Sequence, residues 1–420
     1  MIITRRPILL LAALTCCLGV VPAAGARAHA QSPARAAPAS GLVAIALDSV
    51  IYALSQNGGP PRRLTSGHAA DEPRMSPDGR LIAYLTAGRA LDAAKRPRTH
   101  DVWVVPVTGA GNGSSARRLT APGSLVDRSG LSWSPDSRTL AYYQGRRVIV
   151  SNADGSNAHV ALRLTVPATA ADTLLAESPI AWSPDSRRIA VALPATETVR
   201  PPSTLRVVTV ASGGGAPTTS TARFAAGVLG RPSPLGSYPV GDGLAWTPDG
   251  GHLTFATVHN GAGWGLTGVW QVAVSGGVAH LLVGNPAGVA GTRPPSTAMG
   301  LSTQVAWSPD GRRLALDPAN QLWVADRGAP VGRFYNLGIP GQCRLAQFAW
   351  LSPTRLGYVK LCVVPGPATT TKSAANSPIY ELSLFRLDLG TTTPRLLLRV
   401  RDRSEFALSL SPQYQCIGCG

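Results

Sequence analysis

Five copies of one short phrase constrain the fold of this chain more than any other feature. Each copy joins an aromatic or large apolar residue, a turn of the form Ser/Thr-Pro-Asp-Gly/Ser, a polar pair and alternating apolar residues. The copies are MSPDGRLIAYL at 75–85, WSPDSRTLAYY at 133–143, WSPDSRRIAVA at 182–192, WTPDGGHLTFA at 246–256 and WSPDGRRLALD at 307–317. Two weaker copies follow, WLSPTRLGYVK at 350–360 and the truncated ALSLSP at 407–412. Such self-similarity indicates a repeat architecture.

Each phrase predicts a β-hairpin. Proline presets φ at the second position of the turn, Ser or Thr suits the first, and Asp-Gly tolerates the tight left-handed exit. The strand after the turn is apolar on both faces, as a strand packed between two sheets requires. Two more strand-like runs follow, which in the first repeat are DVWVVPV (101–107) and ARRLT (116–120). Four short strands per unit predict the blade of a β-propeller.

Tryptophan precedes the turn at the same position in four of the repeats. These residues are Trp133, Trp182, Trp246 and Trp307. A single exposed tryptophan is typical of a binding surface, but repetition at identical positions predicts a core between neighbouring blades.

The two ends of the chain decide the number of blades. GLVAIAL (41–47), SVIYALS (49–55) and PPRRLT (60–65) resemble the last three strands of a blade, and ALSLSP (407–412) resembles a first strand. Joined, they complete one blade and leave the ring without an open sheet edge. We therefore predict an all-β, seven-bladed β-propeller of four-stranded blades, closed by the N- and C-terminal strands. Six blades is the alternative if the N-terminal strands pair elsewhere.

The Ser-Pro-Asp-Gly hairpin, its preceding tryptophan and the strand ends Leu64-Thr65 and Leu119-Thr120 resemble the WD-like repeats of the TolB-type propeller family. The resemblance covers about residues 41–412. TolB itself carries an additional N-terminal domain, for which this sequence shows no counterpart. Related propellers occur as the non-catalytic half of prolyl-oligopeptidase-like enzymes and as free-standing exported proteins. The resemblance implies the architecture and a general capacity for binding, because a fold does not fix a function.

The start of the chain reads as a secretory signal peptide over residues 1–30. Arg5-Arg6 supplies a basic start, ILLLAALTCCLGVV (8–21) is apolar, and Ala28-His29-Ala30 offers a small-residue cleavage site. The apolar run is too short to span a bilayer, although a retained anchor or a lipoprotein is the alternative. Both general secretory and twin-arginine export fit the two arginines. The expected location is the periplasm, the cell envelope or the extracellular space.

Three further segments complete the predicted organisation. An Ala/Pro-rich flexible leader covers 31–40, the propeller covers 41–415, and a Cys-x-x-Cys tail covers 416–420. The leader shows no apolar periodicity, so no packed structure is expected there.

Arginine supplies almost all of the formal net charge of +17. Several arginines follow the turns and are spread over the blades, which indicates a solvated rim: Arg80, Arg138, Arg187, Arg188, Arg312 and Arg313. A nucleic-acid-binding protein would show a clustered basic stripe with stacking aromatics, so no nucleic-acid partner is expected. Attraction to an anionic envelope surface or polymer through net charge alone is the alternative.

Motifs of catalysis are missing from the sequence. There is no Gly-x-Ser-x-Gly elbow and no His-Glu-x-x-His motif. We therefore predict that the chain is not an enzyme and uses no cofactor or metal. His68 and His100 fall in predicted loops and are expected to be exposed. A ligand pair formed by the two is the alternative, although a ligand set needs several converging groups.

Acidic residues recur near the first strand of several blades. Asp71, Glu177 and Asp242 come just before that strand, and Asp127 slightly earlier. If these positions surround the mouth of a central channel, their carboxylates are candidates for binding a cation or a peptide amine. The other interpretation is that they accept backbone hydrogen bonds at the blade entrance.

Long connections point to one face of the propeller. Segments 88–100 and 365–378 join second to third strands, and 163–177, 225–243 and 284–303 join one blade to the next. These two classes of connection emerge on the same face, and long loops on a rigid scaffold concentrate binding residues. We therefore expect an exported, monomeric, non-enzymatic propeller that binds a protein or cell-envelope partner through this face. The alternative is a hydrolase or lyase with its site at the channel mouth.

Four cysteines lie outside the predicted signal: Cys343, Cys362, Cys416 and Cys419. An even number in an oxidising compartment favours disulfides, and four cysteines allow three pairings. A two-residue Ser352-Pro353 turn would pair Leu351 with Thr354, and the same register brings Cys343 opposite Cys362, at about 5.5 Å between Cα atoms. A bulge would break this register. Cys416 and Cys419 are expected to form a small local bridge.

Overall fold

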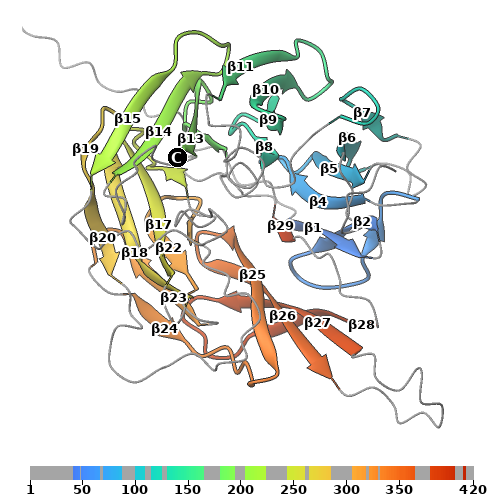
Figure 1. The fold of residues 1–420 in the computed structure, drawn as a ribbon. Helices are drawn as coiled ribbons and strands as arrows, with labels where there is room; N and C mark the ends of the chain where they lie inside the picture. The colour runs from blue at the N-terminus through green and yellow to red at the C-terminus, as the bar shows by residue number, and fades with distance from the viewer. Residues whose placement is uncertain are drawn as a thin grey trace, which may run out of the picture.

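The computed structural model describes residues 41–412 apart from 48, 67–69, 88–99, 109–114, 125–129, 165–179, 194–203, 224–243, 261–263, 285–304, 318–320, 330–331, 365–378 and 403–409. Its strands form seven sheets arranged in a ring (Figure 1). The predicted seven-bladed all-β propeller is therefore confirmed. Over the described residues no helix is long and apolar enough to cross a membrane.

Blades are numbered along the chain, and their strands are given from the ring centre outwards. Blade 1 consists of β29 (Leu410–Pro412), β1 (Leu42–Leu47), β2 (Val50–Ser55) and β3 (Arg62–Arg63). Blade 2 consists of β4 (Ala70–Met75), β5 (Leu81–Ala87), β6 (His100–Pro106) and β7 (Arg117–Arg118). Blade 3 consists of β8 (Ser132–Trp133), β9 (Thr139–Gln144), β10 (Arg147–Asn152) and β11 (His159–Arg163). Blade 4 consists of β12 (Ala181–Trp182), β13 (Arg188–Leu193), β14 (Thr204–Ala211) and β15 (Thr218–Arg223).

The remaining three blades follow the same order. Blade 5 consists of β16 (Ala245–Trp246), β17 (His252–Asn260), β18 (Trp264–Ala273) and β20 (His280–Gly284). Blade 6 consists of β21 (Val305–Trp307), β22 (Arg313–Leu316), β23 (Leu322–Asp326) and β24 (Arg333–Tyr335). Blade 7 consists of β25 (Cys343–Ser352), β26 (Arg355–Val364), β27 (Ile379–Asp388) and β28 (Arg395–Asp402). A short extra strand, β19 (Gly277–Val278), pairs in parallel with β15 and so links blades 4 and 5.

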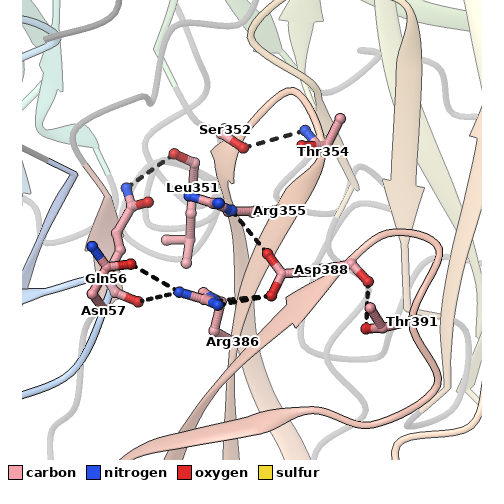
Figure 2. Close-up of polar contacts among 9 residues, drawn as sticks. All are labelled: Gln56, Asn57, Leu351, Ser352, Thr354, Arg355, Arg386, Asp388 and Thr391. Atoms are coloured by element: carbon pink, nitrogen blue, oxygen red, sulfur yellow. Dashed lines mark hydrogen bonds and ion pairs between the residues drawn. The ribbon is translucent and has the colours of Figure 1, made fainter. Parts of the chain in front are cut away.

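The ring closes as the two chain ends predict. β29 is the inner strand of blade 1 and pairs antiparallel with β1, with Ile45 opposite Leu410 and Val43 opposite Pro412. A polar network crosses the seam to blade 7 (Figure 2). In it, Arg386 donates to the Gln56 carbonyl oxygen (3.2 Å) and to the Asn57 side chain (2.9 Å).

Each repeated turn satisfies its own polar groups. In blade 2, Ser76 Oγ donates to Asp78 Oδ1 (2.6 Å) and accepts from the Leu81 amide (3.0 Å). The fourth turn residue has positive φ, which is 71° at Gly79 and 64° at Ser137. This geometry closes the hairpin locally, so the phrase specifies the strand pair wherever it occurs.

Apolar packing lies between the blades. Each of the seven hydrophobic clusters contains residues of two neighbouring blades. The predicted inter-blade position of the repeated tryptophans is confirmed, because all four are buried. Their indole N–H groups also donate to the preceding blade, as Trp133 does to the Arg74 carbonyl (2.7 Å) and Trp246 to the Ala181 carbonyl (3.1 Å).

Outer strands add a second series of ties between blades. In each, a side chain of the outermost strand binds the carbonyl oxygen at the end of the third strand of the next blade. The pairs are Arg62 with Val107, Arg117 with Ala153 (3.4 Å), His159 with Ser212 (2.8 Å) and Ser220 with Val274. Because the acceptors are backbone atoms, different donor side chains serve the same purpose from blade to blade.

The arginines after the turns divide into two groups. Arg80, Arg138, Arg187 and Arg312 are exposed, as a solvated rim requires. Arg188 and Arg313 are half-buried and connect blades: Arg188 lies over the Trp246 ring (4.6 Å), and Arg313 donates to the Pro353 carbonyl (3.0 Å). The rim prediction is wrong for these two, because the second residue after the turn points toward the adjacent blade.

Candidate binding face

The two faces of the ring differ in their connections. The short-turn face carries the repeated turns at 76–79, 134–137, 183–186, 247–250 and 308–311. On the opposite side, the long-loop face, the chain passes from second to third strands and from blade to blade. The long segments predicted to bind a partner lie largely outside the described residues, so their part in binding stays a prediction.

Carboxylates of the short-turn face serve the turns themselves. Burial raises the pKa of Asp249, but hydrogen bonds from the Thr247 hydroxyl, the Gly251 amide and Arg327 outweigh it and leave a pKa of about 2. The pKa of Asp185 is lowered in the same way: burial opposes the shift, and the Ser183 hydroxyl, the Arg187 amide and nearby arginines outweigh it. These groups stay ionised as hydrogen-bond acceptors and are unsuited to proton transfer near neutral pH.

A bulge in β4 forms the candidate site on the long-loop face. The register of β4 with β5 shifts between Asp71 and Arg74, and Glu72 adopts a φ of 50°, which is uncommon for a residue with a side chain. Bulges bend a strand and redirect its side chains, often beside binding sites. The Glu72 amide donates to Asp71 Oδ1 (2.8 Å), and Glu72 Oε2 pairs with Arg74 Nη2 (3.0 Å). The site thus combines two carboxylates and a guanidinium on the inner strand of blade 2.

The side chains of the ion pair are neither buried nor fully exposed. Their relative exposures are 25% for Glu72 and 17% for Arg74. Partial exposure keeps both groups within reach of a bound molecule and strengthens their attraction compared with a fully solvated pair.

Asp71 is thus placed inside β4, one residue after its start, whereas the sequence placed it before the strand. Sequence reasoning missed Glu72 and Arg74. One signal was available: Pro73 within a strand-like run is typical of an edge strand or a bulge, because proline lacks the N–H that a ladder needs.

His100 corrects another prediction. It is the first residue of β6 and is 9% exposed, so it is not an exposed loop residue. Its amide donates to the Ser124 carbonyl (2.9 Å), and the Ser124 amide donates to Asp101 Oδ1 (3.1 Å). β6 therefore begins one residue before the apolar run that the sequence shows. The two hydrogen bonds also hold the segment that leads from blade 2 to blade 3 against the start of β6.

The other candidate residues lie outside the described residues: His68, Asp127, Glu177, Asp242, Cys416 and Cys419. A meeting of His68 with His100 therefore stays a prediction. Among the side chains that the structure describes, no group of three or more His, Cys, Asp or Glu residues is arranged to hold a metal ion.

The predicted disulfide between Cys343 and Cys362 is present, with 4.0 Å between the Cα atoms. Cys343 and Cys362 are directly opposite in β25 and β26. The turn behind the prediction is wrong, however, because Ser352 pairs with Arg355. The pairing at the turn is displaced from the predicted register, and two bulges in β25 shift it back by the same amount. Cys343 therefore lies opposite Cys362. The short Cα separation fits a narrow, non-hydrogen-bonded antiparallel pair.

Comparison with known proteins supports the fold. No protein-family model and no curated protein sequence matches the chain. A solved structure of a protein of unknown function from Desulfotomaculum acetoxidans is 11% identical, with a TM-score of 0.51 over 89% of this chain and 99% of that one. The periplasmic gluconolactonase of Pseudomonas aeruginosa is 15% identical, with a TM-score of 0.50 over 88% of this chain and 99% of that one.

A protein of Agrobacterium tumefaciens assigned as TolB is also similar in structure. It is 12% identical, with a TM-score of 0.39 over 86% of this chain and 89% of that one. The similarity to the D. acetoxidans and P. aeruginosa structures shows a shared fold, from which neither activity nor partners follow. The chain is a seven-bladed β-propeller with structural neighbours among both enzymes and TolB-like proteins.

Proposed function

We propose that this chain is an exported, non-enzymatic propeller that binds a protein or cell-envelope partner on its long-loop face. A partly exposed ion pair on the inner strand of blade 2 carries the proposal. On the short-turn face the repeated hydroxyl and carboxylate groups are bound to their own turns. Toward the long-loop end of β4, the bulge holds the Glu72–Arg74 ion pair, whose exposures of 25% and 17% let it offer charged groups to a bound molecule at the inner edge of a rigid ring.

Two observations on this chain and one on a structural neighbour support export. The sequence begins with a basic and apolar signal-like segment, and Cys343 forms a disulfide with Cys362. Disulfides persist in oxidising compartments outside the cytosol. The gluconolactonase of P. aeruginosa with the same fold is periplasmic.

A hydrolase or lyase at the same place is the second candidate. It is favoured by the adjacent carboxylates of Asp71 and Glu72 beside Arg74, since paired acidic groups serve as general acid and base. The lactonase activity of the P. aeruginosa structural neighbour defines the first substrate class to test.

Capture of partners from envelope extract by the purified propeller, followed by mass spectrometry, tests the proposal. Replacing 225–243 and 284–303 by short Gly-Ser links should abolish capture while the domain stays folded, because surface loops tolerate such changes. Glu72→Gln with Arg74→Gln should weaken capture. The control, Arg80→Gln with Arg138→Gln, removes two charged side chains from the short-turn face and should capture as the unmodified protein does.

Two results decide against the proposal. Undiminished capture by the loop-replaced domain would move the binding site away from the long-loop face. Hydrolysis of gluconolactone by the purified protein, lost in Glu72→Gln, would establish the enzyme in place of the binding protein.

A further inference from the structure

Three exposed arginines gather at the end of blade 3 on the long-loop face. Arg147 begins β10 and lies directly opposite Arg163, the last residue of β11. Arg146 precedes Arg147 in the tight turn from β9 and accepts the Leu164 amide at its carbonyl oxygen (2.9 Å). All three side chains are exposed. Three positively charged side chains therefore start from neighbouring backbone positions at one strand end.

This pairing departs from the pattern elsewhere in the sheets. Of the four other pairs of charged residues that face each other across the described strands, three are oppositely charged and ion-paired. These are Arg313 with Asp326 (3.1 Å), Arg355 with Asp388 (2.8 Å) and Arg401 with Glu381 (2.6 Å). Like charges directly opposite each other destabilise a sheet, so an anion bound between two such arginines would remove that cost.

The second Arg–Arg pair has such an anion. Arg386 faces Arg395 in blade 7, and Asp388 binds the Arg386 guanidinium at 2.9 Å (Figure 2). For Arg146, Arg147 and Arg163, no side-chain hydrogen bond or ion pair is found within the part of the chain that the structure describes. The contrast indicates that the compensating anion of blade 3 is not part of the described protein.

We propose that Arg146, Arg147 and Arg163 form a binding site for a phosphate group. Guanidinium groups match the oxygens of phosphate with paired, charge-assisted hydrogen bonds. The tight turn between Gln144 and Arg147 leaves no long second-to-third-strand loop in this blade to cover the arginines. The site does not depend on the proposed partner or on the β4 bulge. The phosphate is carried either by a small molecule or by a lipid headgroup.

Inorganic phosphate is the first probe, with chloride at equal ionic strength to separate binding from screening. Phosphate should bind the unmodified protein in calorimetry and raise its melting temperature. Arg163→Glu should weaken phosphate binding at least about tenfold, as expected for the loss of charge-assisted hydrogen bonds. The same change creates an opposite-charge pair with Arg147, so it should raise the melting temperature in phosphate-free buffer.

Arg138→Glu is the matched control, because it makes the same charge change at an exposed arginine of blade 3 on the short-turn face. It should keep the phosphate response. An equal loss in Arg138→Glu, or a full response in Arg163→Glu, would overturn the site. Co-sedimentation with phosphatidylglycerol vesicles, lost in Arg163→Glu, would identify a lipid headgroup. A response to inorganic phosphate without vesicle binding would identify a soluble phosphate compound.

Discussion

Gln56 donates its side-chain amide to the carbonyl oxygen of Leu351 at 3.0 Å, across the seam where blade 1 meets blade 7. The two residues are 295 positions apart in the sequence. Gln56 is buried, and a Cβ atom at Gly41 would displace its side-chain amide. The seam is therefore held by a specific polar contact in addition to the pairing of β29 with β1.

Deleting residues 404–420 should destabilise the ring, because it removes β29 and exposes the edge of β1. The expected loss is on the order of several kcal/mol in the free energy of unfolding, measured by urea denaturation. Gln56→Ala is the comparison: it leaves β29 in place and should cost about 1–3 kcal/mol for the unsatisfied Leu351 carbonyl. A truncated protein that melts within about two degrees of the full chain would contradict closure by β29.

Substitution at the fourth turn position should affect stability strongly in blade 6 and weakly in blade 3. A Cβ atom at Gly311 would overlap Pro248 of the neighbouring blade, so Gly311→Ser should cost more than about 2 kcal/mol. Ser137→Gly removes the hydrogen bond from the Asp78 amide (3.0 Å) but relieves a positive φ, so it should change stability by less than about 1 kcal/mol. Equal melting temperatures for the two variants would show that the turns do not interlock as described.

Asp249 predicts a pH dependence of stability. Its pKa of about 2 lies below the ordinary value, so the fold favours the ionised form. Its contribution should be complete above an unfolded pKa of about 3.9 and be lost as the pH falls through about 2. The difference in unfolding free energy between the unmodified protein and Asp249→Asn should therefore be constant from about pH 5 to 7 and shrink below about pH 4. A difference that persists undiminished at pH 2 would contradict this.

Non-reducing peptide mapping should find Cys343 joined to Cys362. The disulfide closes a separation of 19 residues, so replacing both cysteines by serine should cost about 3 kcal/mol. Single replacements, which leave one free thiol, control for effects of the substitution itself. A peptide joining Cys343 to Cys416 or Cys419, or four free thiols, would rule out the pairing.

Much of the fold was predictable from the sequence because the turn phrase is a local device. Ser76, Asp78 and Gly79 close their hairpin with bonds only a few residues long, and five repeats identify the blades. Contacts between blades were harder to predict from the sequence. The tie from His159 to Ser212 joins residues 53 apart and uses a backbone acceptor that carries no sequence signal.

The candidate sites, too, were only partly predictable from the sequence. The β4 bulge depends on how the strand meets β5, and only Pro73 hinted at it. The two bulges of β25 were invisible in the sequence, and the cysteines pair because the bulges offset a wrongly placed turn. The Arg147–Arg163 pair appears only once the strand register is known.

Amide hydrogen exchange of the partner-bound propeller tests most directly whether the long-loop face is the binding face. Backbone amides in 70–72 and 100–102, at the long-loop ends of β4 and β6, should exchange more slowly with the captured partner than without it. Amides of the short turns at 76–80 and 134–138 should exchange at unchanged rates and serve as the internal control. Protection confined to those short turns would contradict the account.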